Sequence, residues 1–571
     1  MLLIEYGSLA IDDSFMPPFN SPAPRFLYNL TSVPQPNANN RTFAVANGCA
    51  VGGGSAVNGQ LFDRGSKHDY DNWAAFPGNK GWDWNGLFPY FKKSVTFNKP
   101  TKEMQEFGIT YDMAAWGGTT PIYASYPAYQ YPAQKVLWAA WAAKDGVKVQ
   151  KEHADGHAYG LFWIPISMDP ASAYNRSFAG IGHWLRVPPR KNYHLLTEHR
   201  VLKINFKEKS GLQEAISVNI KERFGAGKTF TIEAKREIIL SAAATRTPVL
   251  LQLSGIGPKK VLEEAKVKTL VDLPGVGWNL QDHSFSVSTY NFTKDLWPTT
   301  TTITTNATFR AEALAQYKMN NTGPYTAYVV SSGLFLPASS FIGPSFTDLV
   351  SELAAQDPAA YLPPDLPKQL IAGYAFQKKV LLASFQSNTS AILEHLFQAS
   401  PRATMILLKP FSRGRITLNA SDPLGDPVFD YRVLSNPIDL KLHVRMQQYA
   451  RQHFATSRIL AQLGPVELDP GASLPSDKDV AEWLVAGNKL FASNGHSVGT
   501  AAMMPRELGG VVDAGLRVYG TNKLSVADLS IVPLIPGTHT QSTAYAVGEK
   551  VSRAVGKGLG NADQVLGCGF D

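Results

Sequence analysis

Gly48-Cys-Ala-Val-Gly-Gly-Gly-Ser-Ala-Val-Asn-Gly59 is the stretch of this sequence from which the fold is best inferred. So many glycines in one short segment argue against regular secondary structure and let the backbone come into contact with a ligand. Successive backbone N–H groups in such a loop also form a concave site for an anion, such as a phosphate group. The stretch therefore predicts a ligand-binding loop.

Two histidines far downstream stand in similar glycine-containing loops. His496 lies in Ser-Asn-Gly-His-Ser-Val-Gly-Thr, and His539 lies in Pro-Gly-Thr-His-Thr-Gln-Ser-Thr. Between them, the apolar run 524–533 predicts a strand that ends near Asp528, and residues 543–555 predict a helix. Two histidines at the edges of one strand–helix unit suit an acid/base pair. The alternative is that both are surface or structural histidines.

The chain opens with Leu2-Leu3-Ile4, a short apolar run that closes on Glu5. This pattern is expected of the second strand of a dinucleotide-binding unit, whose terminal acid accepts ribose hydroxyls. The Gly-x-Gly-x-x-Gly turn of such a unit should stand some 20 residues earlier. Residues 52–57 and 275–280 come close to it, but both lack the last glycine, and neither follows a buried strand. Either the acidic strand ending is accidental or the gene model lacks its first coding segment.

Composition describes a large globular protein. With 571 residues, the chain is long enough for two to four compact units. Apolar residues make up 44%, and the 47 Gly and 38 Pro indicate many loops rather than a fibrous or disordered chain. The net charge of +8 is scattered, and the densest basic cluster, residues 186–194, is too short to indicate nucleic-acid binding.

Other sequence signals concern the compartment. No apolar run reaches the roughly 18 residues of a membrane span, and the N-terminus has no signal-peptide pattern. Cys49 and Cys568 are the only cysteines, so neither a disulfide framework nor a cysteine metal site is expected, and no metal is predicted. Asn-x-Ser/Thr sequons are frequent and favour a secretory history, with chance occurrence and a cytoplasmic location as the alternative; they begin at Asn29, Asn40, Asn175, Asn291, Asn306, Asn320, Asn388 and Asn419.

Hydrophobic patterns predict the following elements. Strands are expected at 193–197, 201–206, 215–221, 228–234, 237–241, 415–418 and 428–431. Helices are expected at 85–93, from Thr247-Pro248 to Ser254, at 311–317 and at 391–397. Residues 95–170 are rich in aromatic residues and proline without a clear period, which indicates variable surface structure over a site. Residues 290–480 combine expected strands and helices with long connections, a pattern that suits a domain covering the substrate.

Read together, these blocks resemble the glucose-methanol-choline (GMC) family of flavoprotein oxidoreductases. Residues 48–71 resemble the first signature of the family, and residues 244–257 resemble the second, although Ala243 stands where the family commonly has Gly. The loop 272–283, the segment from Ser412 and both histidine motifs match in order. The runs Arg176-Ser-Phe-Ala179 and 503–513 look most like fungal members.

The resemblance implies a fold of mixed α/β and α+β class. A Rossmann-like FAD-binding domain, with its first strand missing, would comprise residues 1–90, 190–290 and 490–571. A substrate-binding or cap domain, built on a mixed or antiparallel sheet with helices, would comprise residues 91–189 and 291–489. Without the first strand and its glycine turn, the chain as given is expected to bind FAD weakly or not at all, unless the start codon is mis-assigned.

The resemblance also implies roles for single residues. Glu5 would bind the ribose of the adenosine half of FAD, and Val201 would touch the adenine region through its backbone. His496 would accept the hydroxyl proton while hydride leaves for the flavin, and His539 would hold the substrate oxygen. Along the flavin and pyrophosphate, the expected cofactor-binding residues are Val51, Gly53, Ser55, Asn58, Gly59 and Asp528.

The chemistry agrees with these roles. Oxidising an alcohol needs a hydride acceptor, which a flavin supplies, and a proton acceptor and an orienting group, which imidazoles supply. Some members of the family carry flavin covalently on a histidine just before the signature Asn; here that residue is Val57, so FAD is expected to be non-covalent. Cys49 is expected to be a small packed side chain.

The expected function is oxidation of the CH–OH group of a small alcohol or of a secondary-metabolite intermediate. Oxygen or a quinone would reoxidise the flavin. One alternative is a redox-neutral synthase or cyclase of fungal polyketide metabolism on the same fold. Another is a non-catalytic remnant with impaired FAD binding. Bleaching of the flavin on anaerobic mixing with substrate would separate oxidation from cyclisation, because bleaching requires hydride transfer.

Overall fold

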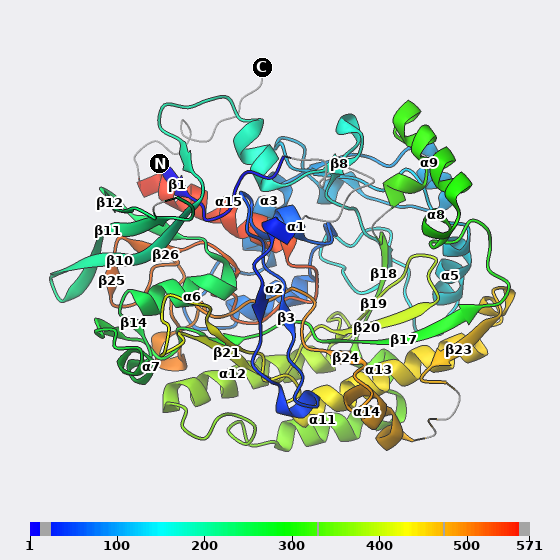
Figure 1. Ribbon diagram of the computed structural model, residues 1–571. Helices are drawn as coiled ribbons and strands as arrows, with labels where there is room; N and C mark the ends of the chain where they lie inside the picture. The colour runs from blue at the N-terminus through cyan, green and yellow to red at the C-terminus, as the bar shows by residue number, and fades with distance from the viewer. Residues whose placement is uncertain (12–23, 226, 328–329, 472–473, 475, 559–571) are drawn as a thin grey trace.

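The computed structural model describes the whole chain except residues 12–23, 226, 328–329, 472–473, 475 and 559–571, so Cys568 lies outside the described residues. Figure 1 shows two regions side by side. Short parallel strands and a twisted antiparallel sheet lie on one side, and a larger sheet with long helices lies on the other. Loops from both halves of the sequence meet between the two regions.

The first region includes two separate pairs of parallel strands that face the large cavity described below. Strand β1 (Leu2–Ile4) pairs with β9 (His194–Leu196), and β13 (Ile238–Leu240) pairs with β26 (Leu524–Val526). The strands predicted at 2–4, 193–197 and 237–241 and within the run 524–533 are therefore confirmed, and Glu5 and Asp528 follow their strands as expected. Beside them lies the antiparallel sheet β10 (His199–Lys209), β11 (Leu212–Glu222) and β12 (Thr229–Glu233), with β25 (Thr521–Asn522) paired to β11.

A cavity of about 2720 Å³ lies between the two parallel pairs. Residues of β1 and residues of β13 both line it, and no described strand bridges β1 to β13. Ligand pockets usually measure roughly 300–1000 Å³. The cavity is therefore larger than one small-molecule ligand requires.

Helix α6 (Ala243–Leu253) begins four residues before the predicted start at Thr247, so Pro248 lies inside it. Proline lacks the N–H that would bond the carbonyl four residues earlier, which belongs to Ala244. The Thr500 hydroxyl donates to this carbonyl at 2.6 Å. The predicted start of the helix at Thr247 was wrong, because the hydrogen bond from Thr500 replaces the one that Pro248 cannot donate.

The second region is built on a seven-stranded antiparallel sheet. Its strands, in spatial order, are β23 (Pro465–Asp469), β17 (Phe285–Phe292), β20 (Arg402–Leu407), β19 (Leu393–Leu396), β18 (Ser332–Leu336) and β6 (Gly160–Trp163), with β24 (Leu490–Phe491) on β17. The helix predicted at 391–397 is wrong, because this segment is strand β19. It pairs with β18 on one side and β20 on the other, and pairing on both sides overrides a weak local helix preference.

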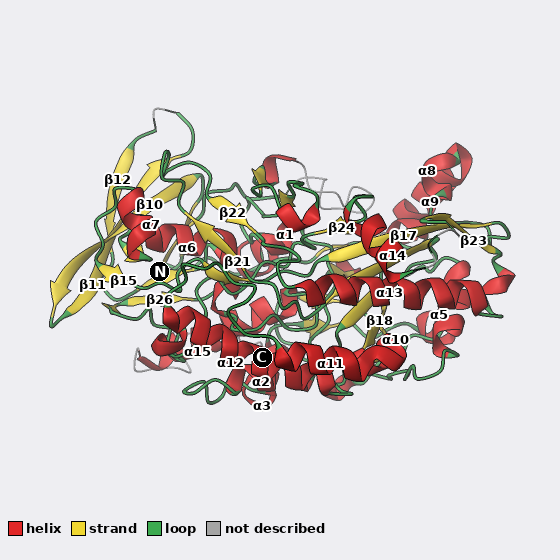
Figure 2. Cartoon of the chain, turned by 90° about the horizontal axis from the view of Figure 1, so that it is seen from below, coloured by secondary structure: helices red, strands yellow, loops and turns green. Residues whose placement is uncertain are grey.

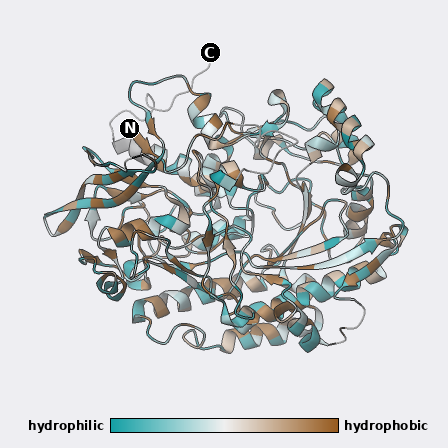
Figure 3. Cartoon of the chain, viewed as in Figure 1, coloured by the Kyte–Doolittle hydropathy of each residue, from teal (hydrophilic) through white to brown (hydrophobic). Residues whose placement is uncertain are grey.

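Long helices cover this sheet, as Figure 2 shows from below. Helix α13 (Pro437–Thr456) packs against β17 and β20, and α11 (Phe346–Ala355) packs against α12 (Lys368–Gln386). Leu370, Tyr374, Gln377 and Leu381 are the buried positions that mark one face of α12. The alternation of brown and teal along α11 and α12 in Figure 3 reflects such one-sided burial.

Residues 95–170 contribute large side chains to the core as well as exposed positions, so the interpretation as variable surface is incomplete. Trp116, Tyr126, Trp141 and Trp163 are all at most 3% exposed. Trp163 stacks on Trp138, which lies in helix α5 (Ala133–Ala142), at 4.3 Å between ring centroids. Aromatic residues without a helical or strand period still bury large apolar areas, and periodicity does not report that burial.

The remaining elements near the site agree with the predictions, although their ends differ by a few residues. They are α3 (Trp84–Lys93), α9 (Ala307–Asn320), β21 (Gly414–Thr417), β22 (Val428–Asp430) and α15 (Gln541–Gly558), and helix α2 (Lys67–Ala74) was not predicted. The glycine stretch 48–59 contains one helical turn, α1 (Gly54–Val57), so it is less irregular than expected. Gly52 and Gly53, just before this turn, are the residues of the stretch that take positive φ.

The described helices include none that is long and apolar enough to cross a membrane. Six of the eight sequon asparagines are exposed, while Asn175 and Asn419 are half-buried.

Candidate active site

His496 and His539 lie next to each other in the structure. Their ring centroids are 5.2 Å apart, and the two ring planes are nearly perpendicular, at 88°. His496 follows β24, whereas His539 directly precedes α15. Both side chains are at least nine-tenths buried. The fold therefore brings the two predicted catalytic residues together in the protein interior.

Two carboxyl groups bracket the His539 ring. Its Nδ1 lies 3.0 Å from Oδ1 of Asp63, and its Nε2 lies 3.4 Å from Oε1 of Glu394. Burial by itself would lower the pKa of His539, but the Asp63 charge, then the Glu394 charge and the hydrogen bond to Asp63, raise that pKa to about 9. Asp63 is fully buried, and although burial opposes its ionisation, His539 holds its pKa below 3.8. His539 is therefore an imidazolium paired with the Asp63 carboxylate at neutral pH.

Glu394 comes from β19 and is completely buried. Burial raises its pKa to about 7, the charge of His539 opposes this rise, and Asp63 adds to it. Neither carboxyl oxygen has a hydrogen-bond partner of regular geometry within the described residues. Buried polar atoms normally have such partners. Glu394 therefore presents unused hydrogen-bonding capacity beside His539.

His496 has the opposite electrostatic setting. Burial and then the neighbouring His539 charge lower its pKa to about 3, and Asp63 opposes this shift. The ring is therefore neutral, with one nitrogen able to accept a proton. Its Nδ1 lies 2.9 Å from Nδ1 of the fully buried His283. His496 and His539 thus differ in charge: the ring of His496 is neutral, and the ring of His539 is cationic.

The backbone around His496 is held by Asp282. This carboxylate accepts hydrogen bonds from the backbone N–H groups of Asn494 and His496, both at 3.1 Å, and from the hydroxyls of Ser493 and Ser497. Burial raises the pKa of Asp282 to about 6, and these four hydrogen bonds oppose that rise. A single buried carboxyl group therefore fixes the loop 493–497.

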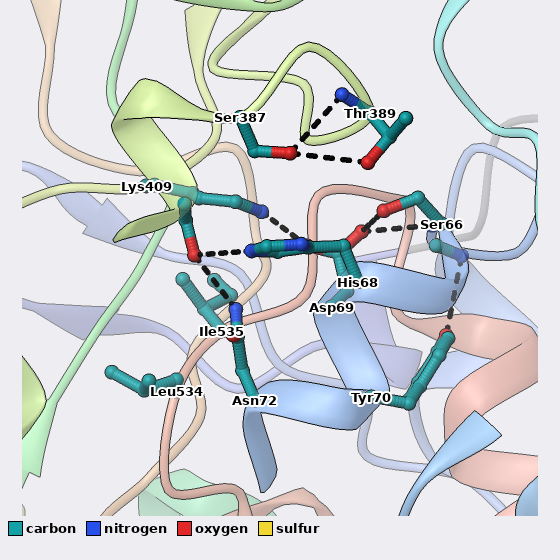
Figure 4. Close-up of polar contacts among 12 residues, drawn as sticks. Ser66, His68, Asp69, Tyr70, Asn72, Ser387, Thr389, Lys409, Leu534 and Ile535 are labelled. Carbon is teal, nitrogen blue, oxygen red and sulfur yellow. Dashed lines mark hydrogen bonds and ion pairs between the residues drawn. The ribbon is translucent and has the colours of Figure 1, made fainter. Parts of the chain in front are cut away.

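A buried ion pair supports the loop that carries His539. Lys409, after β20, contacts the carboxylate of Asp69 on α2, and both side chains are at most 2% exposed. Figure 4 shows this contact together with Ser66, whose N–H and hydroxyl both donate to Asp69 at 2.8 Å. The backbone of Gly537 also interacts with Asp69 and helps to keep its pKa low against the effect of burial. The pair therefore connects α2, the large sheet and the histidine loop.

Three predicted cofactor-binding residues line the large cavity, namely Glu5, Gly53 and Val201. Glu5 is half-buried, and one of its oxygens accepts the N–H of Gly7 at 2.7 Å. A side chain added at Gly53 would meet no atom within 4 Å, so the backbone there is open to a ligand. An acid that accepts hydroxyls and an open glycine backbone fit the adenosine and pyrophosphate parts of a dinucleotide.

The other predicted cofactor-binding residues have different surroundings and are absent from the described lining of this cavity. Val51 is buried and Gly59 is exposed. The hydroxyl of Ser55 donates to the Gly52 carbonyl. Asp528 caps the turn at 529–531, where it accepts the N–H of Ser530 at 2.8 Å, and it also accepts the hydroxyl of Thr247.

Asn58 connects the glycine loop to the histidine region. Its side-chain oxygen accepts a hydrogen bond from Arg176 at 2.8 Å, and its amide donates to Gln541. Gln541 lies two residues after His539. The side chains of Asn58 and Gln541 therefore connect the predicted cofactor-binding loop to the segment that carries His539.

Sequence reasoning missed four polar groups of this site: Asp63, Asp282, His283 and Glu394. Asp282 and His283 end a loop that matched the family, so their position was a usable signal. Asp63 lies inside the first signature, directly before Arg64-Gly65. No signal in the sequence indicated Glu394. Its segment was interpreted as a helix, and a helix there did not predict that the carboxyl group faces the histidines.

Comparison with known proteins identifies the family. GMC oxidoreductase family models match residues 7–285 and 410–548. The chain is 34% identical over 558 residues to the dehydrogenase xptC of Emericella nidulans, covering 97% of this chain and 88% of that protein. An FAD-dependent oxidoreductase from Chaetomium thermophilum superposes with a TM-score of 0.93 at 36% identity, covering 98% of this chain and 95% of that one. A fungal aryl-alcohol oxidase superposes with a TM-score of 0.91 at 37% identity and the same coverage. This chain belongs to the GMC oxidoreductase family and is an FAD-dependent oxidoreductase of the fungal type.

Proposed function

We propose that this chain oxidises the CH–OH group of a small alcohol, with His496 as the proton acceptor and His539 as the group that holds the substrate oxygen. The observation that carries the proposal is the charge difference between the two adjacent rings. His496 is neutral and has a lone pair to accept a proton, whereas His539 is cationic. The similarity to a fungal aryl-alcohol oxidase supports the substrate class.

Bound FAD supplies the hydride acceptor for this reaction. The protein must remove the hydroxyl proton and stabilise the oxygen that loses it. The imidazolium of His539 is a buried positive charge, and such a charge stabilises a developing alkoxide more strongly in the protein interior than in water. A developing alkoxide in turn adds a negative charge beside His496 and raises the proton affinity of that ring.

Glu394 limits how His539 meets the substrate. Both His539 nitrogens already face carboxyl groups, so a substrate oxygen must share Nε2 with Glu394 or displace it. The separation of 3.4 Å from Nε2 to Glu394 is longer than the roughly 2.7–2.9 Å of a strong charged hydrogen bond. Nε2 is therefore held less tightly than Nδ1 and is the nitrogen available to the substrate.

Anaerobic stopped-flow mixing of the FAD-loaded enzyme with aryl and aliphatic alcohols tests the proposal. We expect the flavin absorbance to bleach with a productive alcohol. His496→Ala should slow the bleaching by about 10²–10⁴-fold, the contribution typical of general acid–base catalysis. Product formation without bleaching would contradict the proposal and indicate a redox-neutral reaction, and a His496→Ala enzyme that bleaches at the wild-type rate would exclude His496 as the base.

A further inference from the structure

The contact between His283 and His496 joins two neutral imidazoles. Their Nδ1 atoms are 2.9 Å apart, and the ring planes are perpendicular. Burial is the largest cause that lowers the pKa of His283 well below 6.5, and the positive charges of His539 and Lys409 add to it. Since a hydrogen bond between two nitrogens holds one proton, one ring donates through Nδ1 and the other accepts there.

The direction of this hydrogen bond decides whether His496 is a base at its other nitrogen. A neutral imidazole carries one proton. If His496 donates through Nδ1, then its Nε2 has a free lone pair. If His283 donates instead, the proton of His496 resides on Nε2, and that nitrogen has no lone pair for a substrate proton. Only the first arrangement suits the proposed reaction.

The surroundings of His283 favour the first arrangement. The backbone carbonyl of Leu408 favours a proton on His283. Because Nδ1 of His283 faces His496, the proton for that carbonyl belongs on Nε2. Nε2 is buried and makes no hydrogen bond of regular geometry within the described chain. A proton on Nε2 makes Nδ1 of His283 the acceptor and His496 the donor.

His283 directly follows Asp282, and both residues contact His496. Its neighbour Asp282 binds the backbone N–H of His496, while His283 itself binds the ring. The two adjacent residues therefore control both the main chain and the side chain of the same histidine. Both are more than nine-tenths buried, at 7% and 0% exposure, which keeps water from competing for these contacts.

We propose that His283 is a positioning residue that selects the Nδ1–H tautomer of His496 and so keeps Nε2 free to accept the substrate proton. This inference rests on the proposed role of His496 as the base. His283 acts only through His496, and a partner that fixes the tautomer of a catalytic histidine has a large effect on turnover in other enzymes, about 10⁴-fold in the serine protease triad.

The tautomer can be measured directly in the wild-type protein by ¹⁵N NMR of histidine-labelled enzyme, with His496→Gln used to assign the signal. We expect a protonated Nδ1 and an unprotonated Nε2 for His496. In His283→Leu, we expect the signal to shift towards a mixture of tautomers. A wild-type His496 that is protonated on Nε2 would overturn the proposal without any measurement of activity.

Kinetics of the FAD-loaded enzyme provide the second arm. His283→Leu should lower kcat by about fivefold to tenfold, the equivalent of one hydrogen bond, with little change in KM. His283→Asn, which offers an amide oxygen as acceptor, should recover part of the loss. His443→Leu is the matched control, because His443 is also fully buried and bonded to neighbouring side chains, at 2.8 Å to Ser284, and it should retain the tautomer of His496.

The outcomes separate the two proposals. If His496→Ala is inactive while His283→Leu keeps the wild-type kcat and tautomer, the positioning role of His283 is wrong and the proposed function stands. If His496→Ala keeps full activity, the proposed function is wrong whatever His283 does. Equal losses of kcat in His283→Leu and His443→Leu, with an unchanged His496 spectrum, would assign His283 a purely structural role.

Discussion

At the scale of single residues, the charge on His539 depends on one carboxylate. Asp63 contacts Nδ1 of His539 at 3.0 Å, and its charge contributes most to keeping the ring protonated against the effect of burial. A histidine whose pKa is about 9 is cationic at neutral pH and becomes neutral as the pH rises through that value. If the cation stabilises the alkoxide, activity should be lost on the alkaline side near pH 9.

Asp63→Asn should move this alkaline limb to lower pH. Loss of a nearby opposite charge shifts a pKa by about 1–3 units, and burial, no longer offset, acts in the same direction. A pKa lowered from about 9 by this amount lies between about 6 and about 8. Above about pH 8 the variant should therefore contain mostly neutral His539, and its kcat/KM there should fall by about 10²-fold, as for loss of one stabilising group in a comparable site. The measurement is kcat/KM against pH with a single alcohol.

Thr538→Val serves as the control for this prediction. The Thr538 hydroxyl donates to Asp63 at 2.7 Å, so its removal disturbs the same carboxylate without removing the charge. Its alkaline limb should stay close to that of the wild type. An Asp63→Asn enzyme with an unshifted limb would mean that the charge of His539 does not govern the reaction.

At the scale of elements, helix α6 depends on the loop that follows His496. The buried hydroxyl of Thr500 donates to the Ala244 carbonyl, which lies four residues before Pro248. Thr500→Val should destabilise the protein by about 1–3 kcal/mol, because it leaves a buried carbonyl without a donor. In a Pro248→Ala background, the new N–H of residue 248 can bond that carbonyl, and the same Thr500→Val change should cost clearly less.

Chemical denaturation of the four proteins in this double-mutant cycle measures the coupling. A coupling energy near zero would show that Thr500 does not replace the missing helical donor. Any loss of activity in Thr500→Val would be informative as well, since Thr500 lies four residues after His496 and connects its loop to α6.

The elements that could be predicted from the sequence are those whose local pattern of apolar and polar residues matches their burial in the fold. Strand β1 and helix α15 were found because an apolar run and a small-residue period are local signals. Strand β19 was missed because three of its four residues are buried by partners far away in the chain, and Glu394 was missed with it. The start of α6 was misplaced for the same reason, because Thr500 lies some 250 residues from the proline it compensates for. His496 and His539 were found through their flanking motifs, while Asp63 required the fold.

At the scale of the whole molecule, the candidate site is formed by segments that lie far apart in the sequence. Asp63 precedes α2, His283 precedes β17, Glu394 lies in β19, and the two catalytic candidates flank β26 in sequence. The fold buries many titratable groups, and several of the strongly perturbed ones are neutral histidines. Their desolvation couples the stability of the entire fold to pH.

Five histidines illustrate this coupling, since burial is the largest cause of a lowered pKa in each of them; they are His283, His395, His443, His453 and His496. For four of them the pKa falls to between about 3 and about 4. As the pH falls below 6.5, the unfolded chain binds protons that the folded chain does not, so folding stability decreases. Each such proton contributes about 1.4 kcal/mol per pH unit. Asp282 and Glu394, whose pKa values are raised to about 6 and about 7, act in the opposite direction and offset part of this loss.

Among the described residues, eight histidines have a lowered pKa, and six carboxyl groups have a raised pKa. We therefore expect the thermal midpoint to fall between pH 6.5 and pH 4, because a domain is stable by only about 5–15 kcal/mol and the histidines outnumber the opposing carboxyls. Circular dichroism melts across this range measure the effect. His443→Gln should make the dependence shallower by about one proton, since glutamine does not titrate and can still bond Ser284 and Ser286, the partners of His443. A midpoint that stays constant from pH 7 to pH 4, or a His443→Gln slope equal to that of the wild type, would show that buried neutral histidines do not set the acid limit of this fold.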